Sequence, residues 1–287
     1  MQGIVIMDKP EGVTSFKALG IIKKAYGTKR VGHTGTLDPD ATGVLPILVG
    51  NATRAAELIT ASDKEYITTL ILGVKTDTLD LSGTVLEQRE VNVTEDDVFN
   101  VVSTFIGDIE QIPPMYSAIS VDGVRLHTLA RQGIEIERKP RPVTVHEIEI
   151  LNISLPEITL RVSCSKGTYI RTLADDIGEK LGTLASVKTL RRSKTGIFDL
   201  SKAFSPEEIA KNPEGCLLPL DVCFMEYERI DLDEKKSKMV KNGVPIYFNT
   251  HKGQTLRVYD NEGIFIALSR VEEIDGRNCL KMIKGFY

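Results

Sequence analysis

The segment Gly32-His33-Thr34-Gly35-Thr36-Leu37-Asp38-Pro39-Asp40-Ala41-Thr42-Gly43-Val44-Leu45-Pro46 combines residues that no long regular element would accept. Its glycines permit positive φ angles or close backbone contacts, and Pro39 and Pro46 are unsuited to a helix interior or a central strand. We therefore expect a rigid, shaped loop that presents Asp38 at a fixed angle. The alternative is an ordinary turn cluster in which His33 and Asp38 satisfy only neighbouring backbone groups.

The overall composition is that of an ordinary globular protein. Of the 287 residues, 41% are hydrophobic and 26% charged, which predicts neither disorder nor a coiled coil. The length suggests one large domain plus a small one. No apolar run is long enough to span a membrane, and the first residues lack a targeting pattern, so we expect a cytoplasmic protein.

The cysteine and histidine positions do not predict a metal site. No two cysteines have the two-residue gap of a zinc knuckle, and the histidines lack the helical spacing of a hydrolytic zinc site. A chain of this size needs no disulfide framework, so we expect reduced thiols and no metal enzyme. The four cysteines are Cys164, Cys216, Cys223 and Cys279, and the four histidines are His33, His127, His146 and His251.

Charge is segregated along the chain. The net charge of −4, from 36 basic and 40 acidic side chains, taken alone argues against a nucleic-acid partner. Residues 199–235, however, hold ten acids and four bases, whereas residues 12–37 hold five bases and residues 186–195 hold four, both without an acid. This segregation fits a polyanion-binding face and an outward acidic face, with solvated helix surface as the alternative.

Strand and helix patterns alternate along the chain. Runs of β-branched and aromatic residues between turn residues predict strands, and caps followed by apolar stripes predict helices. Tyr66, near the start of one strand, shares a face with Thr68 and Leu70 and is either a packed ring or a site residue. We expect helices at residues 16–26, 52–59, 94–105, 124–131, 173–181 and 232–242, and strands at residues 3–7, 64–73, 84–87, 143–153, 157–164, 185–192, 196–198, 255–259, 263–269 and 278–283.

Three further stretches suggest binding. Residues 112–144 are long, punctuated by proline and glycine, and carry five bases against three acids, which is typical of a binding loop. Residues 165–172 place lysine, glycine, tyrosine and arginine before a helix, offering backbone donors, a stacking ring and a fixed cation. The last sixty or so residues predict a compact β-rich unit of the size of a recognition module.

The motifs together resemble those of the bacterial tRNA pseudouridine(55) synthases of the TruB type. The matching residues are Gly32 to Pro39, Asp8-Lys9-Pro10, Lys166-Gly167-Thr168-Tyr169-Ile170-Arg171 and Leu190-Arg191-Arg192, and the resemblance covers nearly the whole chain in the same order. It implies an α+β fold with a mixed, mainly antiparallel central sheet flanked by helices. It also implies a catalytic domain at residues 1–227, an RNA-binding insertion at about 112–144, and a PUA-like RNA-binding domain at 228–287.

The resemblance also implies residue roles. Asp38 matches the catalytic nucleophile, Arg171 the arginine that pairs with it, and Tyr66 the tyrosine that stacks on the flipped base and serves in proton removal. These types suit the chemistry, because a nearby guanidinium favours an ionised carboxylate and aromatic stacking offsets the cost of extruding a base. The expected substrate-binding residues are His33, Tyr169, Leu190, Lys9, Arg191 and Arg192, with Lys9 supporting the pocket.

The implied reaction converts uridine 55 in the T loop of tRNA to pseudouridine. It is redox-neutral and needs no cofactor. The implied partner is the T arm of tRNA, whose phosphates would contact the three basic clusters, and the protein would act as a monomer without a membrane or a protein partner. Its binding should weaken steeply with salt.

Two other functions remain open at this stage. A non-catalytic tRNA-binding chaperone could keep the same fold, but a pure binder would not require Asp38, Tyr66 and Arg171 together. A guide-dependent synthase within a ribonucleoprotein is disfavoured by the chain's own insertion at residues 112–144.

Overall fold

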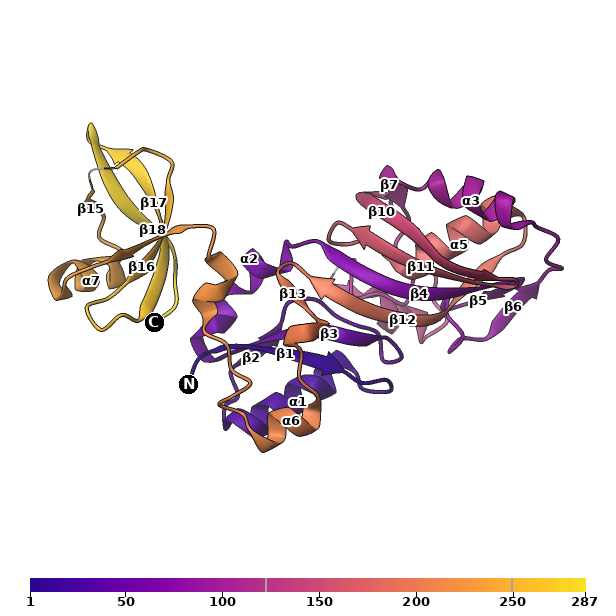
Figure 1. Cartoon of the computed structure of the whole chain (residues 1–287), viewed down its shortest axis with the longest axis horizontal. Helices are drawn as coiled ribbons and strands as arrows, with labels where there is room; N and C mark the ends of the chain where they lie inside the picture. Colours follow the sequence, from indigo (N-terminus) through magenta and orange to yellow (C-terminus); the bar gives the residue numbers. More distant parts are fainter. Residues whose placement is uncertain (122, 249) are drawn as a thin grey trace.

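Two β-sheets organise the chain. The computed structural model describes residues 1–121, 123–248 and 250–287, which form a large sheet and, at one end of the molecule, a five-stranded sheet (Figure 1). The order along the large sheet is β1-β3-β12-β4-β11-β10-β7, with β2 paired to β3 and β13 to β12. Its nine strands are β1 (Gly3–Lys9), β2 (Val31–His33), β3 (Thr42–Val49), β4 (Lys64–Leu72), β7 (Gly107–Gln111), β10 (Arg141–Ser154), β11 (Glu157–Cys164), β12 (Ala185–Thr195) and β13 (Phe198–Asp199).

The large sheet is mainly antiparallel, as predicted. Within the described ranges, the one parallel pairing in this sheet joins β12 to β3 through Arg191 opposite Thr42 and Arg192 opposite Gly43. A Cβ atom at Gly43 would lie 2.2 Å from the carbonyl oxygen of Arg192, and Gly43 has a φ of +103°. The glycine is therefore required for β3 and β12 to meet, and this junction lies directly beside the Asp38 loop.

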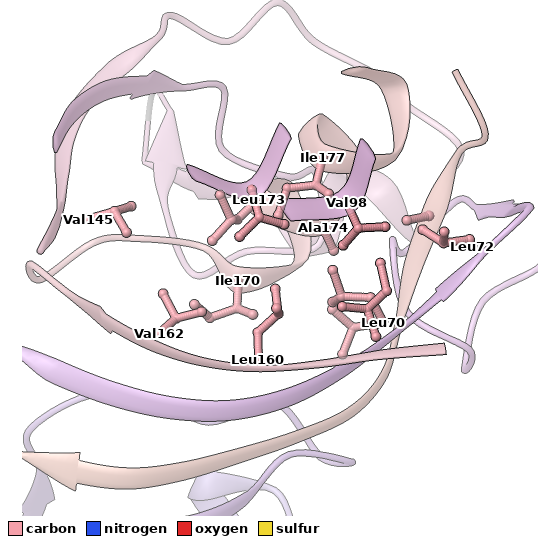
Figure 2. Close-up of a cluster of buried hydrophobic side chains, with 14 of the residues drawn as sticks. Leu70, Leu72, Val98, Val145, Leu160, Val162, Ile170, Leu173, Ala174 and Ile177 are labelled. Atoms are coloured by element: carbon pink, nitrogen blue, oxygen red, sulfur yellow. The ribbon is translucent and has the colours of Figure 1, made fainter. Parts of the chain in front are cut away.

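Two helices cover one face of the large sheet. α3 (Glu95–Ser103) begins at a capping box between Thr94 and Asp97, and α5 (Ile170–Leu181) ends at Gly182 in the left-handed conformation. Both helices contribute apolar side chains to a buried cluster with β4, β10 and β11 (Figure 2). This core fixes the start of α5 relative to the sheet, and Tyr169 and Arg171 are attached there.

The remaining elements of the first 227 residues surround the large sheet. α1 (Ser15–Tyr26) is capped by Thr14, as the sequence predicts, and contacts α6 (Figure 1). No helix in the described ranges is long and apolar enough to cross a bilayer, and the four cysteines are free. The other elements are η1 (Gly50–Ala55), α2 (Ala56–Thr60), β5 (Val74–Thr76), β6 (Val85–Gln88), η2 (Leu200–Lys202), α6 (Pro206–Lys211) and η3 (Leu220–Phe224).

The insertion connects two neighbouring strands, β7 and β10. It contains β8 (Ser120–Val121), β9 (Val124–Arg125) and α4 (Leu126–Ala130), which confirms the predicted short helix; Asp122 lies outside the described residues. The guanidinium of Arg138 donates to the carbonyl of Pro113 over 3.1 Å, so the two ends of the insertion are tied together. Its role in RNA binding stays a prediction.

The β-rich C-terminal unit confirms the predicted class of that segment. Its order is β14-β16-β17-β18-β15, and its apolar face includes Phe265 and Phe286, which share one core with Phe224, Ile4 and Leu48 of the preceding chain. The unit is therefore packed against the preceding part of the chain through a continuous core. Its elements are β14 (Glu228–Asp231), α7 (Glu234–Lys241), β15 (Ile246–Tyr247), β16 (Thr255–Tyr259), β17 (Phe265–Ile274) and β18 (Arg277–Gly285).

Three local predictions need correction. Pro46 lies inside β3, between β1 and β12, although we expected it to exclude a strand. Its carbonyl accepts a hydrogen bond from the amide of Thr34 at the point where the pairing of β3 with β2 ends. The N–H that proline lacks is therefore not needed for a bond within that pairing. α5 begins at Ile170 and not at residue 173, which places Arg171 in its first turn. The short strands β14 and β15 had no predicted counterpart.

Candidate active site

The Asp38 loop is held from three sides. The hydroxyl of Ser15 on α1 bonds both the amide and the carbonyl of Leu37, each over 2.9 Å. The amide of Thr34 donates to Pro46 at one end of the loop. At the other end the ammonium of Lys9 donates to the carbonyl of Pro39 over 2.9 Å. The loop therefore presents Asp38 in one orientation, as predicted from its glycines and prolines.

Lys9 lies where it can support the Asp38 loop, as expected of it. Its side chain is fully buried, and its ammonium also donates to the carbonyls of Pro10 and Val13. Burial lowers its pKa to about 8, with Asp40 and Asp38 opposing that shift. Because its donors are directed at backbone carbonyls, Lys9 positions the loop and does not contact a substrate.

Asp38 and Arg171 form an ion pair in the pocket wall. The Nη2 atom of Arg171 lies 3.0 Å from Oδ2 of Asp38, and the arginine side chain is only 6% exposed against 40% for the aspartate. The same guanidinium donates to the carbonyls of Thr78 and Tyr116 over 2.8 Å each. Its Nε atom lies 3.8 Å from Asp80. The arginine is thus held both by the turn between β5 and β6, which contains Thr78, and by the insertion, which contains Tyr116.

The surroundings of Asp38 raise the pKa of its carboxyl group overall. Burial raises the pKa of Asp38, the Arg171 guanidinium lowers it, and the neighbouring Asp80 raises it again, with a net upward shift. A carboxylate with a raised pKa is a stronger nucleophile when ionised, and Arg171 keeps the ionised form accessible. The pair can therefore supply a nucleophile of fixed position.

Aromatic and apolar side chains complete the pocket. It encloses about 250 Å³, and Tyr66 from β4, Tyr169 from the start of α5 and Leu190 from β12 line it together with Asp38 and Arg171. Burial raises the pKa of both tyrosines, so their phenols stay protonated at neutral pH. With Arg192, which also lines the pocket, the structure brings together six of the nine residues predicted for the site.

Arg192 and Arg191, both predicted to bind the substrate, lie in different surroundings. Arg192 is 1% exposed, and its Nε donates to the carbonyl of Val44 over 2.7 Å, so it lines the pocket from within and cannot contact phosphates on the surface. Arg191 is 40% exposed in its side chain and pairs with Asp8 over 2.7 Å. Of the two, only Arg191 keeps the exposure that a phosphate contact requires.

His33 lies beside the pocket and is not part of its lining among the described residues. It is half-buried in β2, and its Nδ1 is buried without a hydrogen-bond partner within the described ranges. Burial lowers the pKa of His33, and the positive charge of Arg192 lowers it further, so the imidazole is neutral. Its contact with a substrate stays a prediction.

Sequence reasoning missed two polar residues of this site. Asp80 contacts Arg171 from a turn that carried no signal beyond its turn composition. Lys64 lines the pocket two positions before Tyr66 on β4, and strand alternation alone could have found it, because alternate residues share a face. In the parts of the chain that the structure describes, no three His, Cys, Asp or Glu side chains gather closely enough to hold a metal ion.

Comparison with known proteins gives a consistent family. The model "TruB family pseudouridylate synthase (N terminal domain)" matches residues 23–170, and "tRNA pseudouridylate synthase B C-terminal domain" matches residues 171–224. A protein of Clostridium tetani named tRNA pseudouridine synthase B is 46% identical, covering 99% of this chain and 100% of the relative. A protein of the same name from Alkaliphilus oremlandii is 45% identical over 87% of this chain and 84% of its own.

Solved structures share the fold. A chain of a Cbf5-Nop10-Gar1 complex aligns with a TM-score of 0.74 and 24% identity, covering 99% of this chain and 85% of that chain. A chain of an H/ACA RNP bound to a substrate RNA containing 2′-deoxyuridine aligns with a TM-score of 0.72 and 22% identity, with the same two coverages. At these identities the likeness concerns the fold alone. It confirms the predicted α+β class with its mainly antiparallel sheet.

Proposed function

We propose that this chain, which belongs to the TruB family of pseudouridylate synthases, converts the uridine at position 55 of tRNA to pseudouridine with Asp38 as its nucleophile. The coarser activity, pseudouridine synthesis in tRNA, follows from the family and from the name its relatives carry. The position and the mechanism are what we propose. The observation that carries them is the Asp38–Arg171 ion pair in a pocket lined by two tyrosines.

The proposed chemistry needs one nucleophile and one proton transfer. The ionised carboxylate of Asp38 adds to the target nucleoside, the bond between N1 of uracil and C1′ of ribose breaks, and the base rotates. A new bond then joins C5 to C1′, the carboxylate is released, the proton on C5 leaves, and N1 of the base takes up a proton. Atoms and charge balance without a redox partner or an external group, so the isomerisation requires no cofactor.

The pocket residues have separate roles in this proposal. Arg171 holds Asp38 in its ionised form and in a fixed orientation. Tyr66 stacks on the extruded uracil, and its hydroxyl relays the C5 proton, while Tyr169 and Leu190 complete the pocket wall. Stacking of about 1–3 kcal/mol per base offsets much of the few kcal/mol that base extrusion costs.

The rest of the chain serves RNA binding in this proposal. The insertion at about 112–144 and the domain at 228–287 contact the T arm outside the pocket, and exposed bases of α1 and β12 contact its phosphates. Because the catalytic trio and the RNA-binding elements belong to one chain, the protein acts as a monomer without a guide or protein partner. A tRNA substrate places this activity in the cytoplasm.

Mapping pseudouridine in an unmodified tRNA transcript after incubation with the purified protein tests activity and position together. We expect pseudouridine at position 55 and at no other uridine. Pseudouridine at a different position would contradict the assignment of the T loop. Tight tRNA binding with no pseudouridine formed would favour the non-catalytic chaperone.

A further inference from the structure

Two lysines line the same pocket as Asp38, although the chemistry proposed above uses neither. Lys64 is only 8% exposed, and its ammonium donates to the carbonyls of Thr60 and Ser62 at the end of α2. An ammonium has three N–H groups, so one remains without a carbonyl partner. Lys166 is exposed and stands in the loop between β11 and α5. The pocket therefore contains cationic donors besides Arg171.

The loop that carries Lys166 also offers backbone donors. Among the described residues, the amides of Lys166, Gly167 and Thr168 have no hydrogen-bond acceptor. Gly167 has a φ of +86°, and a Cβ atom there would meet nothing within 4 Å, so the loop is open on that side. Consecutive free amides ahead of a helix N-terminus, here that of the twelve-residue α5, form an anion-binding arrangement.

A buried hydroxyl supplies a second, independent indication of a polar ligand. Thr34 lines this pocket at 1% exposure, and its Oγ1 has no hydrogen-bond partner within the described ranges. Buried hydroxyls are nearly always bonded, because leaving one unpaired costs free energy. A ligand oxygen entering the pocket would give this group its partner.

The charges in this region repel one another. Burial lowers the pKa of Lys64 to about 8, and the nearby Arg192 lowers it further. Cys164 and Asp63 oppose this fall, and Lys166 adds the smallest lowering effect. A bound anion would offset both the desolvation of Lys64 and the repulsion between the cations. An RNA strand carries such an anion on each side of every nucleotide.

We propose that Lys64, Lys166 and the free amides of residues 166–168 bind one of the two phosphodiesters that adjoin the target uridine. This inference rests on the proposed function, since the uridine must enter the same pocket. The site fixes the ribose–phosphate backbone while Asp38 acts on the nucleoside. Phosphate binding here is part of substrate positioning and takes no part in the bond changes.

The first test replaces the exposed lysine. Lys166→Ala should raise the Kd and KM for a T-arm RNA about tenfold and leave kcat unchanged, because the phosphate contact is the same in ground and transition states. The slope of log Kd against log salt should fall by about 0.7. Lys180→Ala, the same charge change near the other end of α5, is the matched control and should change neither quantity by more than about twofold.

The decisive test neutralises the phosphates one at a time. T-arm RNAs carrying a single methylphosphonate 5′ or 3′ of the target uridine are compared for binding to the wild type and to Lys166→Ala. At one of the two positions the difference between the proteins should disappear. A difference that persists at both positions would overturn the proposal, as would a Lys166→Ala protein that binds like the wild type.

Lys64→Met keeps the length of the buried side chain and removes its charge, and its thermal melt shows whether it folds. A folded variant should lose affinity for the unmodified RNA and none for the sensitive methylphosphonate RNA. Equal losses on both RNAs would mean that Lys64 only caps α2, contradicting its place in the site. These are binding measurements, so an absence of pseudouridine would refute the proposed function separately.

Discussion

The chain contains two clusters built from an arginine, an aspartate and a tyrosine, and they differ in what is left unpaired. In the joint to the C-terminal unit, the hydroxyl of Tyr259 donates to Asp221 and accepts from Arg257 over 3.1 Å. Arg257 also donates to the carbonyl of Tyr227. The arginine side chain is 10% exposed and the aspartate 21%, so these three groups bond to one another in a joint that is largely closed to solvent.

In the pocket the same residue types are arranged with one face open. Arg171 is as well paired as Arg257, but within the described ranges Asp38 has one cationic partner at ion-pair distance, and its side chain is 40% exposed. Burial raises the pKa of the Asp38 carboxyl. In the joint, burial raises the pKa of the Tyr259 phenol to about 12, and the Asp221 carboxylate adds to that rise. The comparison indicates that full pairing gives stability, and that incomplete pairing beside a hollow gives a reactive carboxylate.

Among the substitutions that compare the two clusters, we expect the largest effect on rate from removing a tyrosine hydroxyl. Tyr66→Phe keeps the stacking ring and removes the proton relay, so kcat for pseudouridine formation should fall about 10³-fold with little change in Kd for tRNA. The matched Tyr259→Phe should lower the Tm and leave kcat within about twofold. Quench-flow single-turnover kinetics and thermal melts of both variants check this. A Tyr66→Phe enzyme of normal rate would remove the relay role.

The next effect concerns the guanidinium. Arg171→Lys cannot hold Asp38, Thr78 and Tyr116 with one fork, so the single-turnover rate should fall about 100-fold. Activity requires the ionised Asp38, whose pKa already lies above its ordinary value, and is therefore lost as the pH falls through that pKa. With the weaker partner the acid limb of the rate profile should move to higher pH. An unshifted limb would contradict the pairing, and Arg191→Lys serves as the control.

A smaller effect is expected in the joint. Asp221→Ala leaves Tyr259 without its acceptor and Arg257 without its nearest carboxylate, which should cost about 2 kcal/mol and lower the Tm by about 4–6 °C. The rate per folded molecule should not change. Asp231→Ala, which removes an exposed partner of Arg229, is the control and should shift the Tm by less than about 1 °C. A loss of catalysis in Asp221→Ala at unchanged Tm would reverse the assignment.

The smallest expected effect is a gain in stability. Because folding raises the pKa of Asp38, its charge lowers stability above the folded pKa, and this deficit disappears as the pH falls through that pKa. Asp38→Asn should therefore raise the Tm by about 1–3 °C at pH 7.5 and by nothing measurable at a pH where Asp38 is protonated in the wild type. A lower Tm at pH 7.5 would mean that Asp38 is a structural group like Asp221.

Local signals in the sequence predict much of the fold. The Thr94–Asp97 capping box and Gly182 give the start of α3 and the end of α5 because caps act within a few residues. Pro46 misleads because its tolerance depends on where the pairing of β2 ends, which only the assembled sheet determines. The strands β14 and β15 are too short to carry an alternation pattern.

In the site too, some residues could be predicted from the sequence and others only from the assembled fold. Asp38, Tyr66 and Arg171 are predicted by motif resemblance, and the structure brings them to one pocket. Burial is what the sequence does not reveal: Lys9, next to Asp8 in a turn signature, and Arg192, in a basic stretch, both donate to backbone carbonyls inside the protein. Asp80 joins the site only through contact between segments that are distant along the chain, so composition gave no reason to select it. Lys64 could have been selected, because it alternates with Tyr66 on one strand.

The central claim is that Asp38 is the nucleophile and not a structural partner of Arg171. The most direct measurement compares wild type and Asp38→Asn for tritium release from tRNA labelled at C5 of uridine, with tRNA binding measured in parallel. We predict that Asp38→Asn binds tRNA within about threefold of the wild type and releases tritium at least about 10⁴-fold more slowly. Release at a comparable rate by the folded variant would contradict the account.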